Sequence, residues 1–160
     1  MAAEAYPSIA AVYDEGRKII GRTKLAAANN GGVILPGSPE DMRFRSHFGV
    51  SPQVVVDAWQ LMDYHGLLPA NAQLCHFLWA LAFMYTYPKN DKALSSLLGN
   101  KDPKTISKYV WPFIQSVFEL DDYVVSDHCG TTLFTTNFSS QVASILTITH
   151  KDSIQEQEET

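Results

Sequence analysis

The chain has 160 residues, of which 46% are hydrophobic, which is enough for one domain with a substantial core and too little for two. Its longest apolar stretch, from Leu74 to Met84, is well short of the roughly 20 residues of a membrane-spanning helix. Its start lacks a secretory signal, so we expect an intracellular protein without a membrane partner. A net charge of −5 argues on average against a nucleic-acid ligand.

Basic residues are concentrated in the middle of the chain and acidic residues at its end. Between Lys89 and Pro112 five lysines face two acids, a net charge of +3. From Phe113 onward one lysine faces eight acids, a net charge of −7. This asymmetry is typical of a basic working surface beside an acidic tail, although two ordinary solvated faces would give the same counts.

Residues 1–41 are predicted to form an irregular arm, because Ala, Gly and Asn occur there without a helical period. The runs Asn29–Gly32 and Pro36–Pro39 are turn and linker sequences. The arm also carries a basic cluster, which could contact phosphates or be a solvated segment: Arg17, Lys18, Arg22 and Lys24.

Residues 42–125 are predicted to form a small bundle of four or five helices, so the expected fold class is all-α. The first helix begins with Ser51 as N-cap and Pro52 at the first helical position, and it ends at Gly66. A second, strongly apolar helix is expected from Asn71 to Pro88. We expect it to be the most buried element.

A short helix and a longer helix complete the predicted bundle. Asn90 caps the short one, residues 91–98, and Gly99 ends it. Asp102 and Pro103 begin the long one, which Pro112 is expected to bend between residues 108 and 112. The helical spacing predicts one shared core from Leu74, Phe77, Leu78, Leu81, Leu94, Leu97, Leu98, Ile106, Val110, Phe113 and Ile114.

Residues 126–160 are predicted to be a weakly structured, Ser/Thr-rich and acidic tail. Its Thr, Val and Ile residues favour a weak hairpin, but nothing in the pattern sets a register. Asp121, Asp122 and Asp127, which flank the start of the tail, are expected to be solvated charges rather than metal ligands.

The segment 91–110 carries the most informative pattern. A short helix with an apolar edge, a turn containing Gly99 and a second helix with outward lysines form the plan of a helix-turn-helix. In such a unit the second helix enters the major groove of DNA, but purely structural bundles use the same plan. The predicted DNA-contacting residues are Lys101, Lys104, Thr105, Lys108 and Tyr109.

These five residues have different predicted roles. The lysines are expected at phosphates, and Lys104 and Lys108 could also reach base edges. Thr105 and Tyr109 are the expected readers of sequence, although Thr105 could instead cap the helix and Tyr109 could belong to the core. The alternative function is a helical protein-interaction module or homodimer that does not bind DNA.

Four segments, in this order, resemble the region that precedes the catalytic domain in Harbinger-like DDE transposases. They are Phe44-Arg-Ser-His-Phe-Gly-Val-Ser-Pro52 leading to Trp59, then Leu78-Trp-Ala-Leu-Ala82, Ala93-Leu-Ser-Ser-Leu-Leu-Gly99 and Thr105-Ile-Ser-Lys-Tyr-Val110. The resemblance covers roughly residues 42–125. It implies a helix-turn-helix that binds transposon-end-like or non-specific DNA, in the nucleus if the source is a eukaryotic transposon.

The chain also departs from that family. The turn from Gly99 to Thr105 is about one residue longer than the family's usual turn. The family's catalytic domain has a ribonuclease-H-like fold with three metal-binding carboxylates, and the residues after Val125 are too few for it. We therefore expect a truncated or remnant protein that is not an enzyme, with no catalytic residue and no cofactor.

Other chemistries are weakly supported by the sequence. The doublets Cys75-His76 and His128-Cys129 lack the spacing with which one segment closes on zinc, so no metal site is predicted. Cys75 is expected to be a small core residue and His76 to lie at the helix surface. A larger set of aromatic residues could stack on bases but is mostly expected in the core: Trp59, Trp79, Trp111, Tyr85, Tyr87 and Tyr109.

Overall fold

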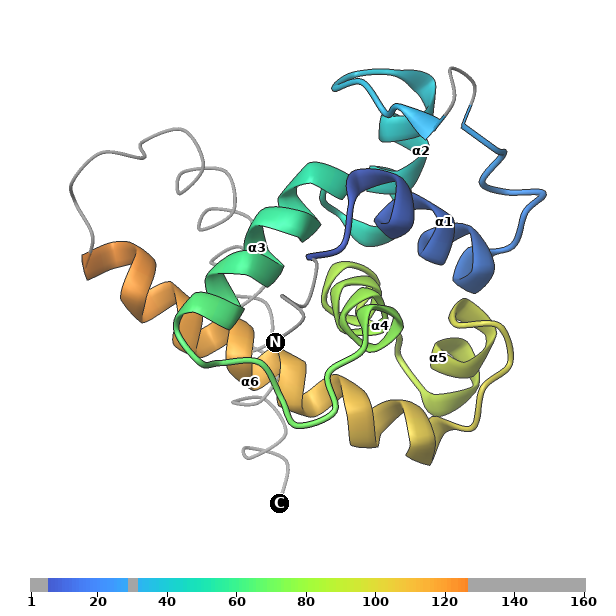
Figure 1. Cartoon of the computed structure of the whole chain (residues 1–160). Coiled ribbons are helices and arrows are strands. Elements are labelled where there is room, and N and C mark those ends of the chain that lie inside the picture. The colour runs from blue at the N-terminus through green and yellow to red at the C-terminus, as the bar shows by residue number, and fades with distance from the viewer. Residues whose placement is uncertain (1–5, 29–31, 127–160) are drawn as a thin grey trace. The chain divides into compact units, whose positions relative to one another are not determined.

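The computed structural model describes residues 6–28 and 32–126. In these ranges the fold is all-α, as predicted: six helices pack together and no strand is present (Figure 1). Helices up to Phe118 belong to one compact unit, and a second unit begins at Glu119, within the last helix. The helices are α1 (Ile9–Ile20), α2 (Pro39–Phe48), α3 (Pro52–Tyr64), α4 (Leu74–Thr86), α5 (Asp91–Leu97) and α6 (Pro103–Ser126).

The first three helices begin with the same local device. Ser8, Ser38 and Ser51 each have extended backbone and accept a hydrogen bond from the backbone N–H three residues later, over 3.1 to 3.3 Å. Ser38 and Ser51 are each followed by a proline at the first helical position, where the missing N–H costs nothing. These bonds depend only on neighbouring residues, which is why α3 lies where the sequence predicts it.

The predicted irregular arm is wrong for residues 9–20. They form α1, which packs against α3 and α4 and buries Val12 and Tyr13. Its Gly16 faces α2 so closely that an added Cβ atom would lie 2.7 Å from the Phe44 ring and 3.0 Å from the Phe48 ring. The missing side chain therefore lets two helices meet. Also, α2 begins at Pro39, before the predicted domain start at residue 42.

The start of the second predicted helix is also wrong. Asn71 has a positive φ of 56° and lies in a turn, in which the Ala72 N–H donates to the carbonyl of Pro69 over 3.1 Å. The helix itself, α4, begins at Leu74 and ends at Thr86, ahead of Pro88. A residue with left-handed backbone does not form part of a right-handed helix. Asn71 therefore lies in the turn before α4, and the N-cap residue of the helix is Gln73.

Helix α4 lies at the centre of the bundle (Figure 1), and most of its residues are buried, as predicted. Nine of the eleven predicted core residues are buried, while Leu74 and Leu97 are half-buried. Aromatic rings from three helices meet in this core. Phe77 of α4 lies 5.3 Å from Phe113 of α6, and Trp59 of α3 lies about equally far from both rings, at 6.1 and 6.0 Å.

Helix α6 continues through Pro112 as one helix. The hydroxyl of Ser116 lies 2.9 Å from the carbonyl of Pro112 and 2.6 Å from the carbonyl of Leu67, so it can donate to either. This contact ties α6 to the segment after α3. The bend expected at Pro112 stays a prediction.

The predicted tail, its hairpin and Asp127 lie outside the described residues, as do the side chains of Asp121 and Asp122. Among the helices that the structure describes, none combines the length and apolar character that crossing a membrane requires.

Candidate nucleic-acid interface

The turn between α5 and α6 is built from two consecutive left-handed residues. Gly99 has a φ of 78° and Asn100 a φ of 61°, and Asn is one of the few side chains that tolerates this conformation. The Asn100 N–H donates to the carbonyl of Ser95 over 2.7 Å, and the Ser95 hydroxyl donates to the carbonyl of Lys101 over 2.7 Å. The turn is therefore stabilised by internal hydrogen bonds of its own backbone and of the Ser95 side chain.

Asp102 caps the start of α6. Its carboxylate accepts from the backbone N–H of Thr105 at 3.0 Å and from the Thr105 hydroxyl at 3.2 Å. Thr105 is exposed, but both of its donors are already engaged. The geometry therefore favours the capping role for Thr105 over that of a base reader.

Three predicted phosphate contacts are exposed together along the turn and the first two turns of α6: Lys101, Lys104 and Lys108. Lys104 and Lys108 are four residues apart, so they lie on one face of the helix, about 6 Å apart along its axis. In the part of the chain that the structure describes, the basic side chains that form ion pairs are Arg17, Lys18 and Arg45, and not these three lysines.

Tyr109 is half-buried, and its ring stacks on His76 of α4 with centroids 4.0 Å apart and planes 8° from parallel. The Nζ atom of Lys108 lies 5.3 Å from the centroid of the same ring. One ring face of Tyr109 is therefore occupied by the protein. Tyr109 serves the packing of α6 on α4, which was the alternative to reading bases.

The expected surface position of His76 is wrong. This residue is only 8% exposed, because Tyr109 of α6 stacks on its ring, and the Trp79 ring also lies 5.0 Å from it. Burial lowers the pKa of His76 below the ordinary value of 6.5. Burial also raises the pKa of the Cys75 thiol, with a further contribution from the charge of Glu15.

The end of α1 lies beside the turn between α5 and α6. A Cβ atom added to Gly99 would lie 3.5 Å from the carbonyl oxygen of Ile19, the penultimate residue of α1. The charges of Glu15 and Lys101 also act on the pKa of the Cys75 thiol, which Glu15 raises and Lys101 lowers. The sequence could not show that Gly99 lies beside Ile19, because the two residues are some eighty positions apart.

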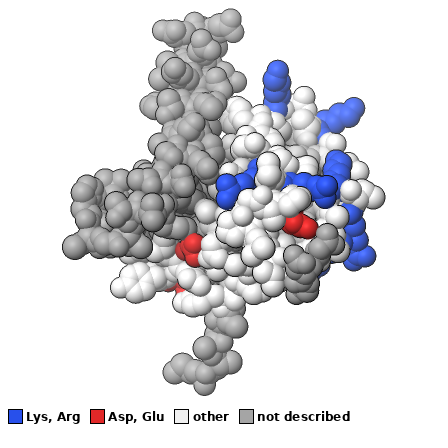
Figure 2. Space-filling view, turned by 90° about the horizontal axis from the view of Figure 1, so that it is seen from above, with Lys and Arg blue, Asp and Glu red and all other residues white. Residues whose placement is uncertain are grey.

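Figure 2 looks down on the molecule from above, and Lys and Arg side chains gather on the right-hand half of that face. Exposed basic residues of α1, α2 and the segment between them are Lys18, Arg22, Lys24, Arg43 and Arg45. The charge of Lys24 reaches His47 of α2 and, after burial, lowers its pKa. A second set of exposed basic residues thus lies on α1, α2 and the segment between them, and the end of α1 lies beside the turn between α5 and α6.

The core assignment of the aromatic residues is wrong for three of them. Tyr85, Tyr87 and Trp111 are 49%, 40% and 57% exposed, while Trp79 is buried and Trp59 and Tyr109 are half-buried. The ring of Phe83 lies edge-on to Trp111 at 5.8 Å and to Tyr87 at 6.1 Å. The rings of Phe83, Tyr87 and Trp111 form an exposed aromatic cluster at the end of α4 and the middle of α6, whereas the Tyr85 ring lies against Gly49.

Within the described ranges, no group of three or more His, Cys, Asp or Glu side chains is placed to hold a metal ion. Cys75 is a free thiol, and the second predicted doublet, His128-Cys129, lies outside those ranges.

No protein-family model, no curated protein and no solved structure matches the chain. The resemblance to Harbinger-like transposases stays a prediction from the sequence.

Proposed function

We propose that this chain binds DNA through the turn 98–102 and the first half of α6, as a helix-turn-helix region similar to the one that precedes the nuclease domain of a Harbinger-like transposase. The observation that carries the proposal is the row of exposed lysines at positions 101, 104 and 108. Ammonium groups at such spacing can each neutralise a phosphate of one DNA backbone.

The packing of the segment supports the same role. The turn is held by Ser95 and the start of α6 by Asp102, so the lysines project from a rigid support. The stack of Tyr109 on His76 fixes the rotation of α6 about its axis relative to α4. The end of α1 lies beside the turn, and exposed basic residues follow it in the sequence at Arg22 and Lys24.

Salt dependence of DNA affinity tests this proposal. The full chain is titrated onto duplex DNA at several salt concentrations and compared with a variant in which Lys101, Lys104 and Lys108 are all alanine. We expect the slope of log affinity against log salt to fall by about three, roughly one for each lost phosphate contact. The full chain is used because α1 packs on α3 and α4.

A matched pair of single variants locates the contact. Lys104→Ala removes one exposed charge from α6, and Arg43→Ala removes one exposed charge from α2. We expect the first to weaken DNA binding several-fold more than the second. Equal affinities and slopes for the wild type and the triple variant would contradict the proposal.

The exposed aromatic cluster favours a second candidate, a helical protein-interaction module. Trp and Tyr are enriched in protein interfaces, and Trp111 exposes more than half of its side chain beside Phe83. If the triple lysine variant binds DNA like the wild type, while Trp111→Ala abolishes self-association in sedimentation, the interaction module is the better account.

A further inference from the structure

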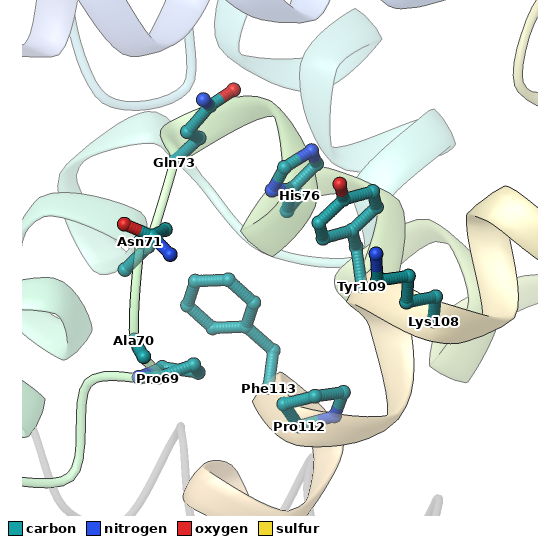
Figure 3. A pocket seen from close by; sticks show the side chains of 10 residues that line it. Pro69, Ala70, Asn71, Gln73, His76, Lys108, Tyr109, Pro112 and Phe113 are labelled. Carbon is teal, nitrogen blue, oxygen red and sulfur yellow. The ribbon is translucent and has the colours of Figure 1, made fainter.

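A pocket of about 280 Å³ lies between the 69–73 segment, the start of α4 and the middle of α6. Figure 3 shows His76 and Tyr109 on one side of it, Pro69 and Pro112 on another, and the ring of Phe113 between them. Its volume is close to the lower end of the range of small-molecule sites, roughly 300 Å³. It therefore suits a ligand of the size of one substituted ring.

The polar groups of the pocket favour an anion. None of its lining residues is acidic, and its one ionised side chain is the ammonium group of Lys108. Asn71 and Gln73 add side-chain amides that can donate hydrogen bonds. Apolar surface from Phe113 and the two prolines supplies the complementary wall for a flat ring.

His76 adds a polar ring to the wall of the pocket. The residue is 8% exposed and lines the pocket. Among the described residues no side-chain nitrogen or oxygen is both fully buried and without a hydrogen-bond partner, so a ring nitrogen of His76 without a partner is open to the pocket or to solvent and can bind a ligand. Because burial lowers its pKa, the ring is neutral at neutral pH and offers one donor and one acceptor nitrogen.

The start of α4 differs from the starts of the other helices. Each of those has a side-chain cap, from Ser8, Ser38, Ser51, Asn90 and Asp102. At α4 the N-cap residue, Gln73, makes no such bond, and Gln73 lines the pocket. The backbone N–H groups of Cys75 and His76 interact with the Cys75 thiol. The helix start still carries partial positive charge, which favours an oxyanion.

We infer that this pocket binds a small organic anion, with a carboxylate or phosphate group attached to a flat ring. The oxyanion lies among Lys108, the His76 ring and the uncapped start of α4, and the ring of the ligand packs on Phe113. Because Lys108 is also a phosphate contact in the proposed function, ligand and DNA compete for that side chain. Binding of the ligand itself is independent of the DNA proposal.

Direct titration of the full chain tests the site. Benzoate and phenyl phosphate are the anionic probes, and benzamide is the uncharged control of the same shape. Binding is measured by calorimetry and by the NMR shifts of the His76 and Tyr109 ring protons. We expect the stronger of the two anions to bind at least about tenfold more tightly than benzamide, since hydrogen bonds to charged groups are roughly twice as strong as neutral ones.

Three variants separate the site from general charge effects. Lys108→Gln and His76→Phe should each weaken anion binding about tenfold. Lys104→Gln, which removes the same charge one helical turn away and does not line the pocket, should change it less than about twofold. Phe keeps an aromatic ring at position 76, and circular dichroism checks that the helices are retained.

The outcomes that overturn the inference are equal binding of benzamide and the anions, equal losses in the two lysine variants, and no shift of the His76 protons. If His76→Phe does not fold, the comparison of anion binding by Lys108→Gln and Lys104→Gln, both at exposed positions, still tests the inference. A DNA titration with saturating probe then tests competition separately, so the pocket and the proposed function can fail independently.

Discussion

The rings of His76 and Tyr109 are stacked 4.0 Å apart and almost parallel, and they join the centre of the bundle to the helix that carries the exposed lysines. The same two residues line the pocket beside α6. Through this contact the position of the lysines on α6 depends on the packing of the core. We therefore expect a change in the protonation of His76 to alter both the free energy of unfolding and the position of these lysines.

The stability of the protein should fall as the pH is lowered below 6.5. Burial holds the pKa of His76 below that value in the folded chain, so the unfolded chain takes up the proton first. The contribution of neutral His76 to stability is fully present above pH 6.5, the ordinary pKa of the unfolded chain. It is lost as the pH falls from 6.5 to the lower pKa of the folded chain, by at most about 1.4 kcal/mol per pH unit for one group. Urea unfolding at pH 7.5 and 5.5 measures it.

His76→Phe keeps an aromatic ring in the stack and removes the titrating group. We expect this variant to lose less stability than the wild type between the two pH values. His47 also has a lowered pKa, from burial and the charge of Lys24, so part of the pH dependence should remain. An unchanged pH dependence in the variant would show that His76 does not contribute.

Replacing Asp102 with Asn should separate the capping role of this residue from the effect of its negative charge. Asn caps a helix about as well as Asp, so the free energy of unfolding should change by less than about 0.5 kcal/mol, whereas Asp102→Ala should cost about 1 kcal/mol. Under the DNA proposal Asp102→Asn also removes a negative charge beside Lys101 and Lys104, which should raise DNA affinity at low salt. Unfolding curves and a DNA titration are the two measurements.

A side chain at Gly16 should destabilise the protein, although alanine is the better helix former. An added Cβ atom would meet the Phe44 ring at 2.7 Å, and that ring is fully buried. We expect Gly16→Ala to cost about 1 to 3 kcal/mol, against a gain of about 1 kcal/mol in helix propensity. Thermal or urea unfolding measures the balance.

A double-mutant cycle checks the cause of that loss. Phe44→Leu removes the ring that the new methyl group would meet, so the two substitutions should be strongly non-additive. Simple additivity would mean that α1 does not lie against α2 as the structure places it.

Truncating Trp111 should leave stability nearly unchanged. Its side chain is 57% exposed, and substitutions at such positions usually stay within about 0.5 kcal/mol. Trp79→Ala, in a buried position, should instead cost about 3 to 5 kcal/mol. A loss for Trp111→Ala as large as that for Trp79→Ala would place Trp111 in the core, as its spacing predicted.

The starts of α3, α5 and α6, which are three of the six described helices, and the order of α3 to α6 could be predicted from the sequence alone. Ser51, Asn90 and Asp102 cap helices through bonds to residues three positions later, and Gly99 adopts a left-handed turn. Such signals depend on a few adjacent residues, so a linear pattern contains them. The exposed lysines at the start of α6 follow from the same helical spacing.

The tertiary structure decided which surfaces are covered. Helix α1 is too short to be stable without the faces of α3 and α4, and Gly16 reveals its packing only when Phe44 lies opposite. His76 is buried because α6 places Tyr109 on it, and Trp111 is 57% exposed although the Phe83 ring of α4 lies edge-on to it. Burial depends on contacts between residues distant in sequence, and a hydrophobic period fixes only the face that each helix offers.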